Sequence, residues 1–459
     1  MDRDMVESIR KEGGPRELPA AVVVHRVHRL RPWLLGALYA AVLLPMSIAP
    51  RHSGNVLSRY MTTEGIVERG TLAIETSPLL ARSGSPDIVR FGPHFYSDKP
   101  PVLPALAAIL YAPLYGAGVR FSGPPAHFVA ANLVLVWGIV GVASGLTLVW
   151  LRQLLQAAPV PPWVADLLTL GFGFATPLLT YGVTFNNHSV AAALITGGLA
   201  LVLLEEPGPA RSKRRHAAAG FLAALAFGID LPAGGVALGA LGIWLTLRMR
   251  SVPLAFLAGA LPPLVLHAVL QSMVTGTPFP AEMYPEAFQY PGSYWASAEG
   301  QWKEPGPRWQ FGLEFLIGPQ GWLTVAPVLA FAPVGIARVL SRRGDPLRPM
   351  AWAVGGMVGV LLVFYIWFIR RTDIAGHSFG TRHLLPVTPA CYFFAVIGLA
   401  RLRSRFAALL FVVLAIVGGV YAVAGMRDPW SRVEMRAPKE PALRVLQHFV
   451  LYPWSSYSR

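Results

Sequence analysis

The sequence predicts an all-α integral membrane protein with about 11 to 12 transmembrane helices. Hydrophobic residues make up 54% of its 459 residues and charged residues only 14%, and the mean hydropathy is +0.49. Apolar runs of about twenty residues, enough to span a bilayer as a helix, recur between residues 33 and 426. Because a spanning segment must satisfy its own backbone hydrogen bonds, runs of this length favour helices.

The apolar runs give the elements in chain order. We expect membrane-embedded segments at 33–50, 101–119, 127–150, 162–184, 188–204, 216–230, 232–247, 252–273, 318–338, 350–369, 383–400 and 405–426. The pair that meets at Asp230-Leu231-Pro232 also fits a broken hairpin, so the helix count is good to about one or two.

Basic residues in the connectors set the expected topology. The positive-inside rule places them all on the cytoplasmic face: the tail 1–32 and the clusters at 211–215, 248–250, 338–348 and 401–405. If every apolar run crossed, the cluster at 211–215 would fall outside. The run 101–119 carries Pro101, Pro104 and Pro113, so we predict that it lies along or dips into the outer face. About 11 crossings remain.

This topology divides the chain into a cytoplasmic basic tail (1–32), a membrane domain (33–426) and an outer-face tail (427–459). The membrane domain carries a first outer loop at 51–126 and a second large one at 274–317. The net charge of +15 lies in short loops, which is typical of topology and anionic lipid contact and not of nucleic-acid binding. The sequence lacks the G-x-x-x-x-G-K-[ST] motif, which argues against an ATP-driven pump.

The first outer loop predicts local structure in detail. Ser53 or Asn55 can cap a helix that runs to Arg69, and Gly70 ends it. Glu64 falls in the middle of the apolar face of this helix, so its carboxylate is either protonated, paired with an arginine such as Arg59 or Arg382, or turned to a polar cavity. Residues 87–97 resemble a small hairpin that turns at Gly92-Pro93.

The turn Tyr96-Ser97-Asp98-Lys99-Pro100-Pro101 follows that hairpin and leads into an apolar run. Lys99 supplies a point charge for phosphate, Asp98 can orient a group or ligate a metal, and the prolines fix the entry angle of the next helix. These residue types suit an enzyme that holds the phosphate of a lipid-linked substrate. A lysine that snorkels beside an ordinary helix start is the structural alternative.

The chain resembles the GT-C superfamily, and in pattern most of all the bacterial lipid A aminoarabinose transferases and the protein O-mannosyltransferases. The turn at 96–101 resembles their acid-Lys-Pro-Pro segment. Further similar elements are Phe185-Asn186-Asn187-His188, Asp230-Leu231-Pro232 and Ser378-Phe379-Gly380-Thr381-Arg382-His383-Leu384-Leu385-Pro386. The resemblance covers roughly residues 33–400.

The resemblance implies inverting transfer of a sugar from a polyprenyl-phosphate donor at the outer face of a bacterial inner membrane. The acceptor, whether lipid, glycan or protein, is not specified. In such enzymes a carboxylate near the start of the first outer loop orients or deprotonates the acceptor. Here Asn55 holds that position, and an amide cannot take a proton. A second acid of the family is replaced by Asn187-His188.

The candidates for the catalytic base are therefore Asp98 and Glu64, then Asp230, then His188. For His188 a hydrogen bond to a loop carbonyl is the structural alternative, and for Asp230 a cap on the following helix. The remaining candidates bind substrate. Lys99 and Arg382 would grip the donor phosphate, and the other binding candidates are Tyr96, His94, Asn55, Asn187 and His377.

Metal binding and two other functions stay open. His94 and His377 would join Asp98 around a divalent ion, although their spacing is not diagnostic. A non-catalytic relative that binds a lipid-linked sugar or scaffolds an assembly would explain Asn55 directly. A lipid or solute transporter would require polar residues deep in the helices and internal symmetry, and the sequence has few mid-helix charges and no repeat.

Overall fold

The computed structural model describes residues 20–83, 87–203, 209–297, 307–368, 376–436 and 439–447. In these ranges it is almost entirely helical, as predicted. The membrane helices of the N-terminal half are α2 (Ala20–Met46), α6 (Pro125–Leu135), α7 (Val142–Leu154), α8 (Pro162–Phe174), α9 (Pro177–Tyr181), α10 (Asn187–Leu203), α11 (Pro209–Ile229), α12 (Leu231–Met249) and α13 (Leu254–Thr275). Those of the C-terminal half are α14 (Arg308–Ile317), α15 (Trp322–Val325), α16 (Ala332–Leu340), α17 (Arg348–Val363), α18 (Thr388–Leu402) and α19 (Arg405–Arg427).

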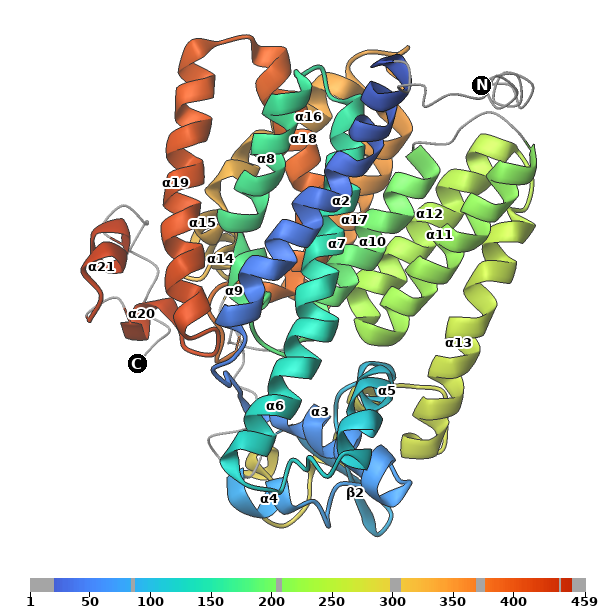
Figure 1. The fold of residues 1–459 in the computed structure, drawn as a ribbon, viewed down its shortest axis with the longest axis vertical. Helices are drawn as coiled ribbons and strands as arrows, with labels where there is room; N and C mark the ends of the chain where they lie inside the picture. The colour runs from blue at the N-terminus through green and yellow to red at the C-terminus, as the bar shows by residue number, and fades with distance from the viewer. Residues whose placement is uncertain are drawn as a thin grey trace, which may run out of the picture.

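These helices form one bundle, with successive passes running up and down between its two ends (Figure 1). Six of the described helices are long and apolar enough to cross a membrane, or seven if the bent pair Arg308–Val325 and Pro327–Leu340 is one span. The others are shorter or more polar, so the expected number of crossings stays a prediction. α2 begins at Ala20, before the apolar run expected from residue 33, because the helix also includes a segment in which alanines and valines alternate with arginines and histidines.

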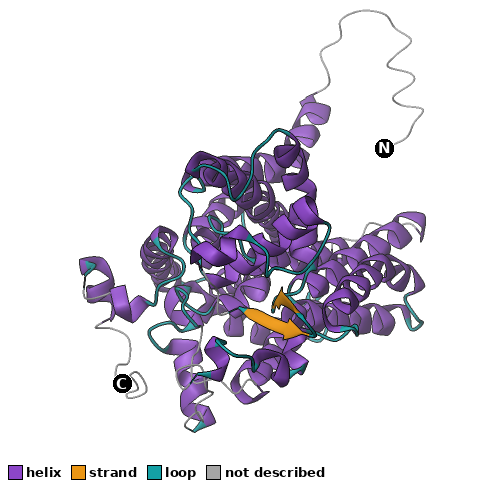
Figure 2. Ribbon diagram, turned by 90° about the horizontal axis from the view of Figure 1, so that it is seen from below, coloured by secondary structure: helices purple, strands orange, loops and turns teal. Residues whose placement is uncertain are grey.

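A smaller cap covers one end of the bundle (Figures 1 and 2). It contains α3 (Gly54–Glu64), the π-helical turn η1 (Gly65–Arg69), α4 (Pro78–Ser83), the strands β1 (Ile88–Phe91) and β2 (His94–Ser97), and α5 (Val102–Gly116). The short helices η4 (Ala281–Met283), η5 (Pro285–Phe288) and η6 (Tyr294–Ala296) of the second outer loop belong to the same end.

The helix and the hairpin predicted in the first outer loop are confirmed, although Ser53, at the N-cap position, makes no side-chain capping hydrogen bond. The helix runs from residue 54 to residue 69, and Gly70 ends it in the left-handed conformation, φ +67°, which glycine adopts without a steric penalty. β1 and β2 pair antiparallel with Phe91 opposite His94, so the chain turns at Gly92-Pro93. α5 packs against α3 in the cap, beside the end of the bundle (Figure 1).

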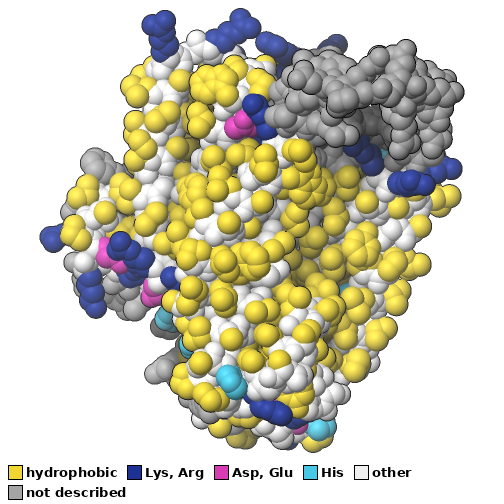
Figure 3. Space-filling view, in the orientation of Figure 1, with side chains coloured by type: hydrophobic (Ala, Val, Ile, Leu, Met, Phe, Trp, Pro, Cys, Tyr) yellow, Lys and Arg dark blue, Asp and Glu magenta, His cyan; other side chains and the backbone are white. Residues whose placement is uncertain are grey.

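The end of the bundle away from the cap is the basic end. The connectors that join α12 to α13, α16 to α17 and α18 to α19 all lie there. Figure 3 shows lysine and arginine side chains along this edge and a broad hydrophobic surface between it and the cap. Because cytoplasmic loops are enriched in Lys and Arg, the basic end is the one expected to face the cytoplasm, and the orientation with the cap outside stays a prediction.

Glycines allow the closest helix contacts. A Cβ on Gly259 of α13 would lie 1.9 Å from the carbonyl oxygen of Ala217 in α11, and one on Gly220 of α11 would lie 2.0 Å from that of Phe256. Such small-residue crossings are typical of packing between membrane helices. They bring the backbones of α11 and α13 into close contact.

Candidate functional site

A cluster of buried charged and polar side chains lies where the cap meets the bundle. It is assembled from α3, from the turn after β2, from the first residues of α10 and from the junction of α11 and α12. The 3-10 helix η9 (Arg382–Val387), which packs against α10, completes it. These elements are far apart in the sequence, and most of the predicted site residues lie on them.

Lys99 stands between two carboxylates. Its Nζ lies 2.6 Å from Asp98 Oδ2 and 3.0 Å from Asp87 Oδ1. The side chain of Asp98 is 3% exposed, and its second oxygen, Oδ1, is buried without a hydrogen-bond partner among the described residues. Lys99 therefore pairs with two acids, and Asp98 Oδ1 can accept a hydrogen bond from a further donor.

The turn is held in place by serines. Ser97 at the end of β2 shares a hydrogen bond of 2.9 Å with Ser58 of α3, and the same hydroxyl accepts from the backbone N–H of Lys99 at 3.2 Å. Pro101 then starts α5, so the chain enters that helix at a fixed angle. The lysine is thus set by hydrogen bonds and is not a snorkelling residue at an ordinary helix start.

Burial raises the pKa of Asp98 to about 7, and the negative charges of Asp87 and Glu282 add to this against the opposing effect of Lys99. The pKa of Asp87 is instead lowered, mainly by Lys99, despite burial. The pKa values of the two acids shift in opposite directions because two close carboxyl groups that share one cation cannot both ionise readily. A carboxyl group with a pKa near neutrality suits general base catalysis.

Arg59 links α3 to α10. Its guanidinium donates to the side-chain oxygens of Asn55 and, at 2.9 Å, of Asn187, and the residue is only 2% exposed. Burial lowers the pKa of Arg59 to about 10, while the charges of Asp98 and Asp230 among others oppose the shift. The two asparagines at positions where the resemblance leads us to expect acids therefore bind the same buried cation.

Asp230 completes the network from the junction of α11 and α12. Its Oδ2 lies 2.6 Å from His188 Nδ1 and accepts from Asn187 Nδ2 at 3.1 Å. No side-chain cap hydrogen bond from Asp230 to α12 is present, so the predicted capping role is not what holds it. His188 is oriented by this carboxylate and not by a loop carbonyl.

Arg382 approaches the cluster from η9. Its guanidinium carbon lies 5.0 Å from the ring centroid of Trp430, whose indole N–H donates to Thr184 Oγ1 at 3.0 Å. The charge of Arg382 affects the pKa of both Arg59 and Asp87, so the three groups are within electrostatic range of each other. Arg59, Lys99 and Arg382 thus bring three cations to one buried region.

Several predicted residues lie elsewhere. Glu64 forms an ion pair with Arg69, on its own helix, and not with Arg59 or Arg382, because the π-helical turn after Glu64 brings Arg69 back toward it. This carboxylate does not join Lys99. His94 is exposed, and its Nδ1 lies 2.7 Å from Glu75 Oε1.

The other residues away from the cluster are Tyr96 and His377. Tyr96 packs with Val89 and the second outer loop at Ala281, and His377 is exposed. In the part of the chain that the structure describes, no group of three His, Cys, Asp or Glu side chains could hold a metal ion. The metal site considered around Asp98 is therefore not formed by these residues.

Three members of the cluster were not predicted. Arg59 was considered only as a partner for Glu64, Asp87 only as the start of the hairpin, and Trp430 only as a residue of the C-terminal tail. The sequence could have indicated Arg59, because it lies four residues after Asn55 on a predicted helix and side chains at that spacing are neighbours. For Trp430, which reaches the site from the end of α19, the sequence held no signal.

The raised pKa of Asp98 predicts a pH-dependent stability. An acid whose folded pKa lies above its unfolded value stabilises the fold most below the unfolded pKa, and this contribution is lost as pH rises through about 7. We therefore expect the Tm of the purified protein to fall between pH 5 and pH 8, and to fall less in Asp98→Asn. Equal slopes in thermal unfolding scans of the two proteins would contradict the assignment.

Fold and cluster together define an all-α integral membrane protein with a buried, charged site at one end of its bundle. Two solved structures are similar to it, both of ArnT from Cupriavidus metallidurans. For the apo structure the sequence identity is 16% and the TM-score is 0.46. The match covers 90% of this chain and 76% of that chain. For the structure bound to undecaprenyl phosphate the sequence identity is 15% and the TM-score is 0.48. The match covers 90% of this chain and 74% of that chain.

At these TM-scores and identities the likenesses carry no argument about this chain. No family model matches the chain, and no curated protein matches it. The functional argument below therefore rests on the residues of the cluster.

Proposed function

We propose that the protein is a membrane glycosyltransferase that takes a sugar from a polyprenyl-phosphate donor and passes it to an acceptor at the extracytoplasmic face of a bacterial inner membrane. The observation that carries the proposal is the placing of Lys99 between two acids, one of them a buried carboxyl group with a pKa near 7. Cations for a leaving phosphate and a base for an acceptor lie in one cluster.

In the proposed reaction the acceptor hydroxyl attacks the anomeric carbon of the sugar. The bond from that carbon to the phosphate oxygen breaks, and the electron pair stays on the phosphate. Lys99 and Arg382 stabilise the charge that builds there, and since this charge is larger in the transition state than in the bound donor, they lower the barrier. Asp98 takes the proton of the acceptor through its unpartnered oxygen.

The other residues of the network have supporting roles. Arg59 is held by Asn55 and Asn187 and adds positive potential beside the donor phosphate. Asp230 orients His188, which is the alternative proton acceptor. No role in the transfer is assigned to Glu64, which is committed to Arg69.

A second function is favoured by one observation. Asn55 and Asn187 place amides where the resemblance leads us to expect acids, and the side-chain oxygen of each accepts a hydrogen bond from Arg59. A protein that binds a lipid-linked sugar without turnover would keep the cations and need no such acids. This non-catalytic relative is the alternative, and a transporter is disfavoured because the charged network lies at one end of the bundle.

The test is transfer or hydrolysis of labelled sugar by the purified protein in lipid nanodiscs. Polyprenyl-phosphate donors that carry different sugars are offered, with empty nanodiscs as the control. We expect release of labelled sugar from at least one donor, with polyprenyl phosphate as the other product. Binding of a donor without any turnover would support the non-catalytic alternative, and absence of binding by every donor would contradict both.

A further inference from the structure

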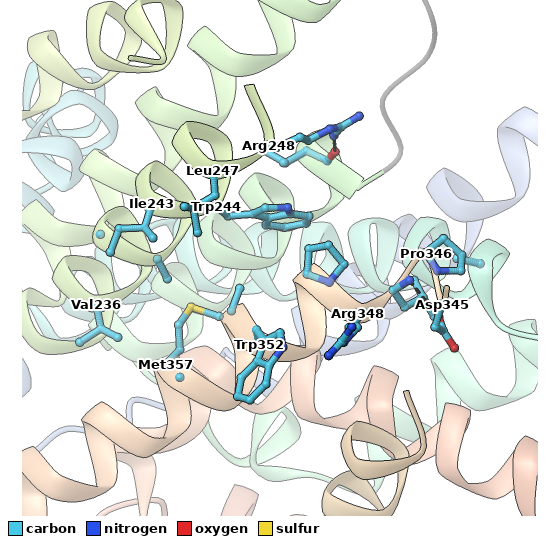
Figure 4. A pocket seen from close by; sticks show the side chains of 18 of the residues that line it. Val236, Ile243, Trp244, Leu247, Arg248, Asp345, Pro346, Arg348, Trp352 and Met357 are labelled. Carbon is cyan, nitrogen blue, oxygen red and sulfur yellow. Dashed lines mark hydrogen bonds between the residues drawn. The ribbon is translucent and has the colours of Figure 1, made fainter. Parts of the chain in front are cut away.

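A cleft of about 1500 Å³ lies between α12 and α17 and runs from Arg248 and Arg348 at the basic end along both helices to Gly235 and Val360. This volume exceeds the roughly 300–1,000 Å³ of pockets that hold drug-sized ligands. Apolar side chains from both helices line most of it, as Figure 4 shows, among them Ile243, Trp244, Leu247, Trp352 and Met357. The exposed fractions of Leu247 and Trp352, 72% and 62%, indicate that the cleft opens to the lipid-facing side.

Arginines gather at one end of this apolar cleft. Arg248 comes from the last turn of α12 and Arg348 from the first turn of α17, and Arg343 and Arg401 also line the cleft. Asp345 is the acid among them, but its carboxylate is bound by Arg401 and by the backbone N–H of Leu347. The end of the cleft therefore carries an excess of positive charge.

Arg348 is the most informative of these residues. Its Nε is buried and has no hydrogen-bond partner among the described residues, while the residue as a whole is half-buried. It also stands at the N-terminus of α17, where the helix dipole is positive and a cation is unfavourable. A half-buried guanidinium that lines the cleft with an unpartnered Nε, at the positive end of a helix, suits an anion from outside the chain.

Two glycines leave space along the wall of the cleft. Gly239 of α12 and Gly356 of α17 both line it, and a Cβ at either position would meet no heavy atom within 4 Å. No helix packing requires a glycine at these two places, unlike at the α11–α13 crossing. Their effect is to leave room along the apolar part of the cleft.

We propose that this cleft binds an anionic phospholipid of the surrounding bilayer. The phosphate lies at Arg348 and Arg248, and the acyl chains lie along Trp244 and Trp352 over the glycines. Basic pockets between membrane helices recognise anionic head groups in this way. This phosphate position lies at the opposite end of the bundle from Lys99, in the leaflet next to the basic connectors, so it is separate from the proposed donor site.

The experiment is native mass spectrometry of the purified protein after equal exposure to phosphatidylglycerol, phosphatidylcholine and undecaprenyl phosphate. We expect retention of phosphatidylglycerol over phosphatidylcholine by about tenfold. Arg348→Gln should remove this preference, and Gly239→Leu should lower the bound lipid altogether by filling the cleft. The matched controls are Arg405→Gln, an exposed arginine of the same end, and Gly359→Leu, an open glycine of α17 outside the cleft.

Three results would overturn the proposal. Equal retention of the two phospholipids by the wild-type protein would show ordinary lipid contact. Equal losses in Arg348→Gln and Arg405→Gln would show a general charge effect. Retention of undecaprenyl phosphate alone would assign the cleft to a polyprenyl lipid instead of a phospholipid.

Discussion

Asp98→Asn is expected to lower sugar transfer by about 10²–10⁴-fold while donor binding stays within a few-fold. The amide has the same size and keeps an oxygen for Lys99, but it cannot take a proton from an acceptor. Asp98 is the one predicted base that lies against Lys99, 2.6 Å from its Nζ, and that has an unpartnered oxygen. Initial rates at saturating donor, with binding measured separately, would separate the two effects.

Two matched variants sharpen this test. Asp87→Asn removes the other acid on Lys99, whose lowered pKa makes it an ion-pair partner and not a base, so its rate should fall much less. Glu64→Gln changes a carboxylate that pairs with Arg69 outside the cluster, and its rate should stay within about tenfold of the wild type. Loss of transfer in Glu64→Gln with activity kept in Asp98→Asn would reverse the assignment.

The fold was largely predictable because its signals are local. Long apolar runs predict membrane helices, and the prolines of the run 101–119 predict that α5 is not an ordinary spanning helix. The helix from 54 to 69 and the hairpin at Gly92-Pro93 follow from caps and turn residues within a few positions. The start of α2 was missed because the helix also includes a segment in which alanines and valines alternate with arginines and histidines.

The site was predictable only where its members are neighbours in the sequence. Asp98 and Lys99 are adjacent, so their pairing needed no knowledge of the fold. The bond between Arg59 and Asn187 joins residues 128 positions apart, and no local pattern signals it. The same holds for Trp430 over Arg382, which depends on how α19 ends beside η9.

Glu64 shows why a charge on an apolar face does not by itself identify a site. Glu64 is buried, but so is every residue of α3 from Val56 onward, so the helix has no single buried stripe. Its partner is Arg69, five residues on, which an ordinary α-helix would not bring opposite to it. The π-helical turn η1 changes the register, and this local irregularity has no clear sequence signal.

Lys99→Ala is expected to abolish both donor binding and turnover, with a loss of transfer of at least about 10²-fold. It removes the cation nearest to the expected donor phosphate and leaves Asp98 and Asp87 facing each other without a counter-charge. Breaking a buried ion pair in this way costs about 3–5 kcal/mol, so the variant must be checked for folding by its Tm. Lys439→Ala, at an exposed lysine of the C-terminal tail, is the matched control and should behave as the wild type.

A second variant keeps this prediction testable if Lys99→Ala does not fold. Lys99→Met with Asp98→Asn removes the charge of both partners at similar volume, and replacing a buried ion pair by neutral groups is often tolerated. A folded double variant that neither binds nor turns over the donor supports the role of Lys99 in holding the phosphate. A folded double variant that still binds the donor as tightly as the wild type would mean that Arg382 and Arg59 hold the phosphate, and that the lysine serves only to pair the two acids.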